Sequence, residues 1–395
     1  MNKLRFPKIQ LAMATLATAV CCCAALPAQE TSSIHVVITN NNVYQEPMNS
    51  AAVFQLAGSS LTSAPLLRTN GEGVGVQFYA TNQQVVAAVG GKVCTFISDG
   101  NTSDIAAFDT TNFGAPVHLG KFVDPSGMGN YSGIALATRG TVLIAGYSMS
   151  SNIGVWAINS DCSLTLASPA SNTPVARIIN DVNISPDQKT VVATFDVEEP
   201  GLYTFALSGT SLTQAGVYDS AAVIGGIDFS ADSQYVLLGG VSATGTQVDI
   251  FPINSDSTLG EQDYYSFAEG GNDASNLWLS PDGTALYVSN NDSLQITTLR
   301  FNEAGNHGRR LAFNCLSSVL KNPAGGTISH TGGIATASPT GKGEYLYVAE
   351  YGSVSAIGLL SIPAGACPVE VSGSPFVNPT QGFPGTLVAY PSRPF

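Results

Sequence analysis

Charged side chains are scarce in this sequence. Asp, Glu, Lys and Arg make up 11% of the 395 residues, against about 25% in ordinary soluble proteins. Basic residues are the rarer kind, with 15 Lys and Arg against 28 Asp and Glu, and the formal net charge is −13 at pH 7. Such a protein would repel phosphate groups rather than neutralise them, so we expect no nucleic-acid partner and no binding to an anionic membrane surface.

Histidines are few and the common catalytic motifs are missing. The 4 histidines of the chain are His35, His118, His307 and His330. The Ser-centred elbow of α/β-hydrolases, the HExxH zinc motif and the phosphate-binding P-loop are all absent. Oxygen-bearing side chains alternate from Asp99 to Asp104 as in a calcium loop, but the glycine and the distal glutamate of such a loop are lacking. We therefore expect a hydrophilic turn there, and we predict no metal and no cofactor.

Helical periodicity is almost absent, and a strand-turn-strand pattern takes its place. Its plainest copy is an apolar strand at residues 277–279, a Ser-Pro-Asp-Gly turn, and a second strand at residues 286–288. Copies recur about every 50 residues, a period that is typical of propeller blades rather than of helical repeats. Aligned by the last apolar residue of the first strand, the copies fall at Phe78, Leu136, Ile184, Phe229, Leu279, Ala337 and Ala389. The second strands then begin at Val85, Val142, Val191, Tyr235, Leu286 and Leu346.

The seventh unit is divided between the two ends of the chain. Residues 34–39 match a second strand and residues 53–56 a third, but no first strand precedes them. The missing strand lies at residues 386–391, and pairing it with the N-terminal strands would cover two open sheet edges. The fold class is therefore predicted as all-β, a seven-bladed β-propeller whose ring is closed by pairing of the N- and C-terminal strands. The alternative, an open array of β-sandwiches, would lack the regular period.

The N-terminus has the pattern of a secretory signal. Lys3, Arg5 and Lys8 precede an apolar stretch at residues 11–26, which is shorter than the roughly 20 residues of a membrane span. We predict a signal peptide at residues 1–28, cleavage before Gln29, and a single propeller domain at residues 29–395. The protein would be exported, to the periplasm, the cell surface or the medium, with no integral membrane span. A lipoprotein anchored through one of the cysteines at positions 21–23 is the alternative.

Four cysteines remain after the signal, at Cys94, Cys162, Cys315 and Cys367. None lies in a Cys-x-x-Cys pair, which makes zinc binding the weaker interpretation. An even number in an exported chain favours disulfides, and four cysteines allow three connectivities. Their positions within the repeat place Cys94 near Cys162 and Cys315 near Cys367 in neighbouring blades, and we predict those two pairs.

The repeat motifs resemble those of a known family. The Ser-Pro-Asp-Gly turn at residues 280–283, its relatives at 185–187 and 338–339, the Leu-Tyr-Val strands and the Gly-Ser-Pro-Phe connector at 373–376 are similar to those of the seven-bladed lactonase-like propellers. That group includes phosphogluconolactonase-type proteins and merges with the YVTN surface-layer repeats. The resemblance covers nearly all of the predicted mature chain. It implies a fold, because these motifs shape turns and strands and perform no chemistry.

The resembling enzymes carry His, Arg and acidic residues at the central mouth, often with a histidine just ahead of an inner strand. Those places read Asn, Asp, Ser and Gly in this chain, for example Asn180-Asp181. Opening a lactone needs a base that activates water and a donor that holds the oxyanion. The candidate catalytic residues are His330 or Asp181 as the base and Arg177 as the electrophile. The candidate ligand-binding residues are Asp219, Glu269, Asp273 and Asn276, with ordinary solvated loop residues as the alternative.

Three functions fit these observations. The favoured one is an exported, non-catalytic propeller, monomeric, that binds a small molecule, a glycan or a protein at its mouth. A lactone hydrolase, 6-phosphogluconolactonase-like and acting outside the cytoplasm, follows from the resemblance alone. A structural component of the cell surface or envelope is the third. Whether the protein is an enzyme at all therefore stays open at this point.

Overall fold

The computed structural model describes residues 35–44, 48–75, 83–127, 133–175, 178–195, 201–220, 223–242, 245–267, 274–302, 310–337, 345–363, 366–380, 382 and 385–393. The chain from Ile34 to Phe395 forms one compact unit. The predicted signal peptide lies outside the described residues and stays a prediction. Within the described part of the chain, no helix is long and apolar enough to span a bilayer.

The unit consists of seven antiparallel sheets. From the innermost strand outward, the first three are β5 (Gln84–Val89), β6 (Lys92–Asp99), β7 (Asp104–Asp109), β8 (Val117–Val123); β9 (Ile134–Arg139), β10 (Val142–Tyr147), β11 (Asn152–Ile158), β12 (Leu164–Ser168); and β13 (Asp181–Ile184), β14 (Thr190–Phe195), β15 (Gly201–Ser208), β16 (Ser211–Asp219). The next two are β17 (Val223–Phe229), β18 (Tyr235–Ser242), β19 (Gly245–Pro252), β20 (Asp263–Phe267); and β21 (Ala274–Leu279), β22 (Ala285–Asn290), β23 (Gln295–Asn302), β24 (Arg310–Leu316).

The last two sheets carry one extra strand each. They are β25 (Ile328–Thr336), β26 (Tyr345–Gly352), β27 (Ser355–Ser361), β28 (Val369–Glu370), with β29 (Phe376–Val377) also on β27; and β30 (Val388–Tyr390), β1 (Val36–Asn40), β2 (Ser50–Ala57), β3 (Ser60–Ser63), with β4 (Leu67–Arg68) also on β2. A short 3₁₀ turn, η1 (Ala170–Asn172), follows β12. Each sheet is one blade.

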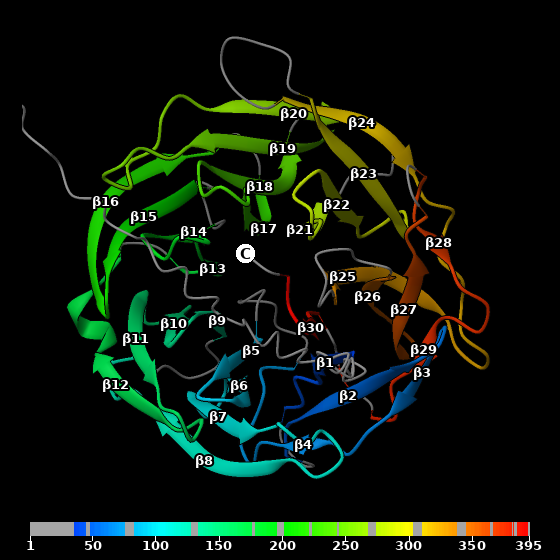
Figure 1. The fold of residues 1–395 in the computed structure, drawn as a ribbon, viewed down its shortest axis with the longest axis horizontal. Helices are drawn as coiled ribbons and strands as arrows, with labels where there is room; N and C mark the ends of the chain where they lie inside the picture. The colour runs from blue at the N-terminus through cyan, green and yellow to red at the C-terminus, as the bar shows by residue number, and fades with distance from the viewer. Residues whose placement is uncertain are drawn as a thin grey trace, which may run out of the picture. The chain divides into compact units, whose positions relative to one another are not determined.

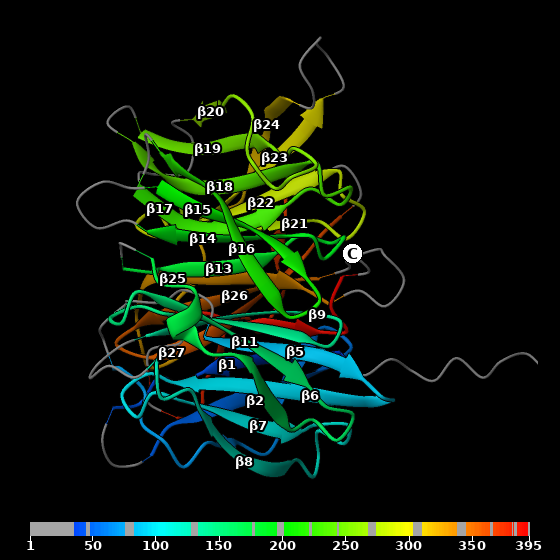
Figure 2. The ribbon, with the colours of Figure 1, turned by 90° about the vertical axis from the view of Figure 1, so that its left-hand side faces the viewer.

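The blades close into a ring. The innermost strands contact one another in the order β5, β9, β13, β17, β21, β25, β30 and back to β5, and they surround the centre of the ring in Figure 1. Figure 2 shows the same ring from its side, with the strands of successive blades stacked above one another. The predicted seven-bladed propeller is confirmed.

The ring is closed by the two ends of the chain, as predicted. β30 pairs antiparallel with β1, so that Ala389 lies opposite Val37. The Thr39 hydroxyl donates to the carbonyl oxygen of Thr386 at 2.7 Å, and the Thr386 hydroxyl donates to Gln84 Oε1 at 2.9 Å. One blade thus takes its innermost strand from the C-terminus and the rest from the N-terminus.

One strand assignment from the repeat was wrong. Val85 and Val86 were expected in the second strand of their blade, whereas they lie in β5, its innermost strand. Gly90 and Gly91 have φ of 60° and 80° and form a two-residue hairpin that leads from β5 into β6, a geometry that suits glycine. Residues 76–82, which include the supposed first strand at Phe78, lie outside the described residues.

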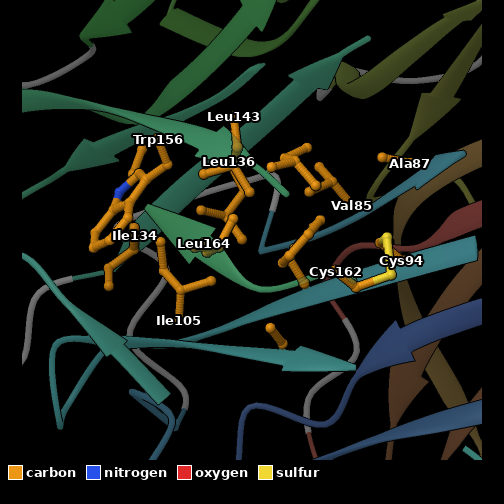
Figure 3. Packing of buried hydrophobic residues seen from close by; sticks show 14 of the residues in the cluster. Val85, Ala87, Cys94, Ile105, Ile134, Leu136, Leu143, Trp156, Cys162 and Leu164 are labelled. Atoms are coloured by element: carbon orange, nitrogen blue, oxygen red, sulfur yellow. A yellow bond between two sulfur atoms is a disulfide. The ribbon is translucent and has the colours of Figure 1, made fainter. Parts of the chain in front are cut away.

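The apolar core lies between neighbouring blades. One cluster joins Val85 and Phe96 of one blade to Leu136 and Trp156 of the next, and Figure 3 shows part of it. In a propeller each blade packs against its two neighbours, so alternate residues of every strand face one of two such cores. The alternation of apolar residues in the sequence therefore specifies the packing as well as the strands.

Both predicted disulfides are present. Cys94 of β6 is bonded to Cys162, which lies in the turn between β11 and β12, with a Cα–Cα distance of 5.2 Å. Cys315 of β24 is bonded to Cys367, just before β28, with a Cα–Cα distance of 5.7 Å. Each bridge joins two neighbouring blades. The first is fully buried within the cluster of Figure 3, and the cysteines of the second are partly exposed.

The Ser-Pro-Asp-Gly turn is held by its own side chains. Ser280 Oγ donates to Asp282 Oδ1 at 2.6 Å and accepts from the amide of Ala285 at 2.9 Å. The Gly283 amide donates to the carbonyl oxygen of Ser280 at 2.8 Å. Gly283 has a φ of 69°, in the left-handed region. The motif thus fixes the hairpin between β21 and β22.

Replacing Gly283 by Ala is expected to lower the free energy of unfolding by about 1–2 kcal/mol, because an L-residue pays that much in the left-handed region. A Cβ there would also lie 3.2 Å from the Cβ of Ala231. Urea unfolding followed by tryptophan fluorescence measures the change. Gly114→Ala is the control: Gly114 is exposed and has no left-handed φ, so its change should stay within about 0.5 kcal/mol. Equal losses in the two variants would contradict the role of the turn.

Candidate functional site

A partly open cavity of about 130 Å³ lies where the innermost strands meet. Five inner strands contribute to its wall, namely β5, β9, β13, β21 and β30, together with the C-terminal residues Ser392 and Arg393. Its lining residues are Gln84, Val85, Val86, Leu136, Ala137, Thr138, Arg139, Val182, Asn183, Trp278, Leu387, Val388, Ser392 and Arg393. We call this space the axial cavity. Both charged residues in its wall are arginines.

Arg393 is anchored by a buried ion pair. Its guanidinium donates to both carboxylate oxygens of Asp228, and also to the carbonyl oxygen of Leu279 at 3.1 Å. Asp228 is 1% exposed and accepts from the Leu279 amide as well, at 2.7 Å. The Arg393 Cζ lies 4.1 Å from the centre of the Trp278 ring, a cation–π arrangement. The residues after β30 are therefore held by contacts to two blades, those of β17 and β21.

Arg139 is the second cation of the cavity, and it is not paired in the same way. Burial and the positive charge of Arg393, partly offset by Asp228, together lower the pKa of Arg139 to about 10. The side chain therefore remains charged at neutral pH. Its Nε atom is buried and has no hydrogen-bond partner within the described residues. Arg139, Arg393 and Asp228 together leave one positive charge beside the cavity.

Gln84, the first residue of β5, supplies a second unpartnered donor. Its Oε1 accepts from the backbone amide of Asn40 at 3.2 Å and from the Thr386 hydroxyl. A backbone amide can only donate, so the oxygen of the Gln84 side chain must face Asn40, and this fixes the orientation of the amide group. Gln84 is 3% exposed, and its Nε2 has no partner within the described residues. Leaving a buried donor unpaired costs about 1–3 kcal/mol.

The other polar side chains of the wall are satisfied locally. Asn183 donates to the carbonyl oxygen of Ile227 at 3.1 Å and accepts from the Ile184 amide at 2.8 Å. The Thr138 hydroxyl donates to the carbonyl oxygen of Val142 at 2.9 Å. The indole of Trp278 donates to the Thr336 hydroxyl at 3.0 Å. The wall thus combines two arginines and Gln84 with locally bonded polar side chains, an aromatic ring and aliphatic side chains.

The predicted base residues lie on two different inner strands. Asp181 begins β13 and is fully buried, and its Oδ1 accepts from the Val182 amide at 2.8 Å. His330 lies in β25, partly exposed, with its ring 5.2 Å from that of Tyr351. Arg177, the proposed electrophile, lies outside the described residues. The catalytic assignment of all three stays a prediction.

Two of the four predicted ligand-binding residues lie in the described part of the chain. Asp219 is exposed at the end of β16, the outermost strand of its blade. Asn276 lies in the inner strand β21 and is 9% exposed. Glu269 and Asp273 lie outside the described residues. Asp219 and Asn276 are not among the residues that line the axial cavity, and the role of all four stays a prediction.

Sequence reasoning missed the residues of the axial cavity. A usable signal existed for Arg139, because a charged residue that ends an inner strand is unusual in a chain with so few basic residues. Trp278 packs between blades and also reaches the cavity. The contact between Arg393 and Asp228 spans 165 positions and had no local signal.

The expected hydrophilic turn at Asp99 is more buried than its composition suggests. Asp99 and Asp104 lie opposite each other across β6 and β7, 0% and 2% exposed. Asn49 and Thr69 donate to Asp99 Oδ1, and Lys121 Nζ lies 3.1 Å from Asp104 Oδ2. Within the described residues, no group of three His, Cys, Asp or Glu could hold a metal ion. Burial, with the nearby charge of Asp104, raises the pKa of Asp99 well above its ordinary value.

This raised pKa predicts a loss of stability with rising pH. The unfolded chain releases the Asp99 proton near its ordinary pKa of 3.8, whereas the folded protein retains it to higher pH, so unfolding becomes easier as pH rises through that window. Asp99→Asn should remove this dependence and raise the free energy of unfolding at pH 8. Urea unfolding at pH 5 and pH 8 measures it, with the exposed Asp219→Asn as control. A parallel pH dependence in both variants would refute the effect.

The comparisons with known proteins concern the fold. No protein-family model and no curated protein matches the sequence. A candidate 6-phosphogluconolactonase from Bacteroides fragilis matches the structure with a TM-score of 0.64 at 17% identity, over 91% of this chain and 99% of the other. A second one, from Bacteroides uniformis, gives 0.64 at 16% identity, over 90% and 99%. The periplasmic gluconolactonase PpgL of Pseudomonas aeruginosa gives 0.50 at 14%, over 68% and 78%.

At such low sequence identities the structural similarity establishes the fold but not the function, which has to be argued from the residues of this chain. The match with the two Bacteroides proteins spans nearly their whole length and most of this chain. It agrees with the resemblance of the turn and strand motifs. The chain is a seven-bladed β-propeller with the lactonase-like fold.

Proposed function

We propose that this protein is an exported, non-catalytic propeller that binds a small molecule in its axial cavity. The observation that carries the proposal is the charge of the cavity wall, which holds Arg139 and Arg393 and in which the carboxylate of Asp228 binds Arg393. A bound ligand with acceptor atoms would form charge-assisted hydrogen bonds with such a wall. Pockets of this kind, mostly apolar with a few polar groups, are the common form of small-molecule sites.

Export is supported by two independent features. The N-terminal segment has the charge and hydropathy of a secretory signal, and the two disulfides are typical of an oxidising compartment. Expression of the full chain in a bacterial host, followed by fractionation and N-terminal sequencing, tests this. Gln29 is the expected first residue of the exported product. A full-length product retained in the cytoplasm would refute export. Lipid modification of a cysteine at position 21, 22 or 23 would show instead that the exported protein is anchored as a lipoprotein.

The absence of catalysis is tested with a panel of lactones. The exported protein is expected to show no hydrolysis above the uncatalysed rate for five-membered and six-membered sugar lactones, with or without a phosphate group. Tryptophan fluorescence and calorimetry then test binding of small polar molecules to the same sample. Turnover of any lactone would refute the non-catalytic part of the proposal.

A lactone hydrolase is the second candidate, favoured by the fold shared with proteins whose names describe lactonases. In that case Arg177 and either His330 or Asp181 are the expected machinery. The double variant Arg177→Ala, His330→Ala should then lose at least about 100-fold in kcat/KM, since each role contributes that much or more. An Arg68→Ala variant, changed at an exposed position of β4, should keep its activity.

A further inference from the structure

We propose that residues 391–393, which follow β30 and which we call the C-terminal strap, hold the last strand in the ring and close one end of the axial cavity, with Arg393 as the anchor. This role needs no ligand, so it is independent of the proposed function. Three observations carry it: the short backbone pairing of β30, the buried contacts of Arg393, and the position of those contacts at one end of the ring.

The backbone pairing that closes the ring is short. β30 pairs with β1 at three positions, from Val36 opposite Tyr390 to Ile38 opposite Val388, whereas β1 pairs with β2 at five. The ends of a chain are commonly poorly ordered unless other contacts tie them down. A strong contact just after Tyr390 would therefore help to keep β30 in its blade.

Arg393 supplies such a contact. Its guanidinium binds both carboxylate oxygens of Asp228, and an ion pair with two hydrogen bonds fixes orientation as well as distance. The guanidinium also donates to the carbonyl oxygen of Leu279 and lies over the ring of Trp278. Arg393 and Asp228 are 8% and 1% exposed, so little water competes for these groups. The end of the chain is thus anchored in the protein interior.

These contacts reach across the ring rather than along it. Among the inner strands, β30 contacts β25 and β5. Asp228 lies in β17 and Leu279 in β21, which are three and two blades away from β30. The charge of Arg393 also acts on Arg139 of β9, two blades away in the other direction. Figure 1 shows the red segment after β30 running toward the centre of the ring. The strap therefore lies close to the axis.

The strap belongs to one end of the ring. Asp228 is the last residue but one of β17, Leu279 ends β21, and Arg139 ends β9. The inner strands run in one direction, because every blade repeats the same strand order from the axis outward, so these residues share one end. Ser392 and Arg393 are part of the wall of the axial cavity. Releasing Arg393 would remove this part of the wall and open the cavity at that end.

The first test separates the anchor from overall stability. Arg393→Gln, Asp228→Asn replaces the ion pair by neutral side chains and leaves no buried charge unpaired. Hydrogen exchange of the exported protein, followed by mass spectrometry, should be at least about tenfold faster in β30 and β1 of this variant, with β14 and β15 unchanged. A chain that ends at Pro391 should give the same result. Arg68→Gln, at an exposed position, is the control and should change none of these strands.

The second test measures access to the cavity. Thr138 lines it from β9, and Thr138→Cys places a thiol there, whereas the four cysteines after the predicted signal are bonded in pairs. Alkylation of this thiol by iodoacetamide should be at least about fivefold faster when the chain ends at Pro391, because local opening sets the access of the reagent. Ser211→Cys, exposed on the outermost strand β16, is the control and should react at the same rate in both chains.

Each result decides the proposal. Faster exchange confined to β30 and β1, together with faster alkylation at position 138, supports the strap. Equal acceleration in all blades overturns it, because Arg393 would then contribute only to overall stability. Unchanged exchange overturns the anchor, and unchanged alkylation overturns the closure of the cavity. If the shortened chain does not fold, the double variant serves for both measurements. The proposed function is refuted separately, by lactone hydrolysis or by the absence of ligand binding.

Discussion

Replacing Arg393 by Met is expected to lower the free energy of unfolding by about 3–5 kcal/mol, because it leaves the buried carboxylate of Asp228 without its countercharge. Asp228 is 1% exposed and Arg393 is 8% exposed. The carboxylate would keep the amides of Phe229 and Leu279 as donors, but two amides do not neutralise a charge in a low-dielectric interior. The stacking of the guanidinium on Trp278 would be lost as well.

The cost should come from the orphaned charge rather than from the missing side chain. The double variant Arg393→Met, Asp228→Asn is therefore expected to recover about half of the loss, since Asn is neutral and can still accept one of the two amides. Urea unfolding of the single and double variants measures the coupling. Arg68→Met, at an exposed position, is the control and should change stability by less than about 0.5 kcal/mol. If the double variant recovers none of the lost free energy of unfolding, the loss comes from the packing of the Arg393 side chain and not from the unpaired charge of Asp228.

This ion pair also shows where sequence reasoning stops. The Ser-Pro-Asp-Gly turn carries its own hydrogen bonds, and strand alternation repeats locally, so both could be found from short segments. The pairing of β30 with β1 joins the two ends of the chain, and it was still predictable because a repeat with a missing strand calls for that strand elsewhere. Counting the strands in each repeat was therefore enough to predict this long-range contact.

The axial cavity has no such repetition. Its wall takes Gln84, Arg139 and Trp278 from different levels of three blades, and Arg393 from the segment after the last strand. Nothing in the local sequence distinguishes Gln84, Trp278 or Arg393. The burial and the contacts of all four side chains depend on residues of other blades, which the closed ring brings close to them. The residues sought at the mouth were chosen by chemistry that the resemblance implied. A site that departs from that chemistry could only be found from the packing.

The single misassigned blade has a similar physical reason. The Phe78 copy was matched by hydrophobicity alone, whereas the strand pair β5 and β6 is set by a Gly90-Gly91 turn with both φ positive. Two glycines between apolar runs are a strong hairpin signal. Weighing turn chemistry above apolar spacing would have placed Val85 in the innermost strand.

Loss of the Cys94–Cys162 bridge is expected to lower the free energy of unfolding by about 4 kcal/mol, because the bridge closes a loop with a sequence separation of 68 and so restricts the unfolded chain. The variant Cys94→Ala, Cys162→Ala tests this by urea unfolding without reductant. The Cys315–Cys367 bridge has a separation of 52, and its removal should cost nearly as much on this ground. A loss below about 1 kcal/mol for either pair would show that the bridge does not constrain the unfolded chain.

The two bridges should differ strongly in how fast a reductant reaches them. Thiol–disulfide exchange needs direct attack on a sulfur atom, and Cys94 and Cys162 are both fully buried, whereas Cys315 and Cys367 are partly exposed. In folded protein treated with dithiothreitol, alkylation and mass spectrometry should find Cys315 and Cys367 labelled first, with Cys94 and Cys162 labelled only as the chain unfolds. Adding urea serves as the control, since it should make both pairs react at similar rates. Simultaneous labelling of both cysteine pairs without urea would contradict this prediction, because it would mean that the folded protein exposes the Cys94–Cys162 bridge to the reductant.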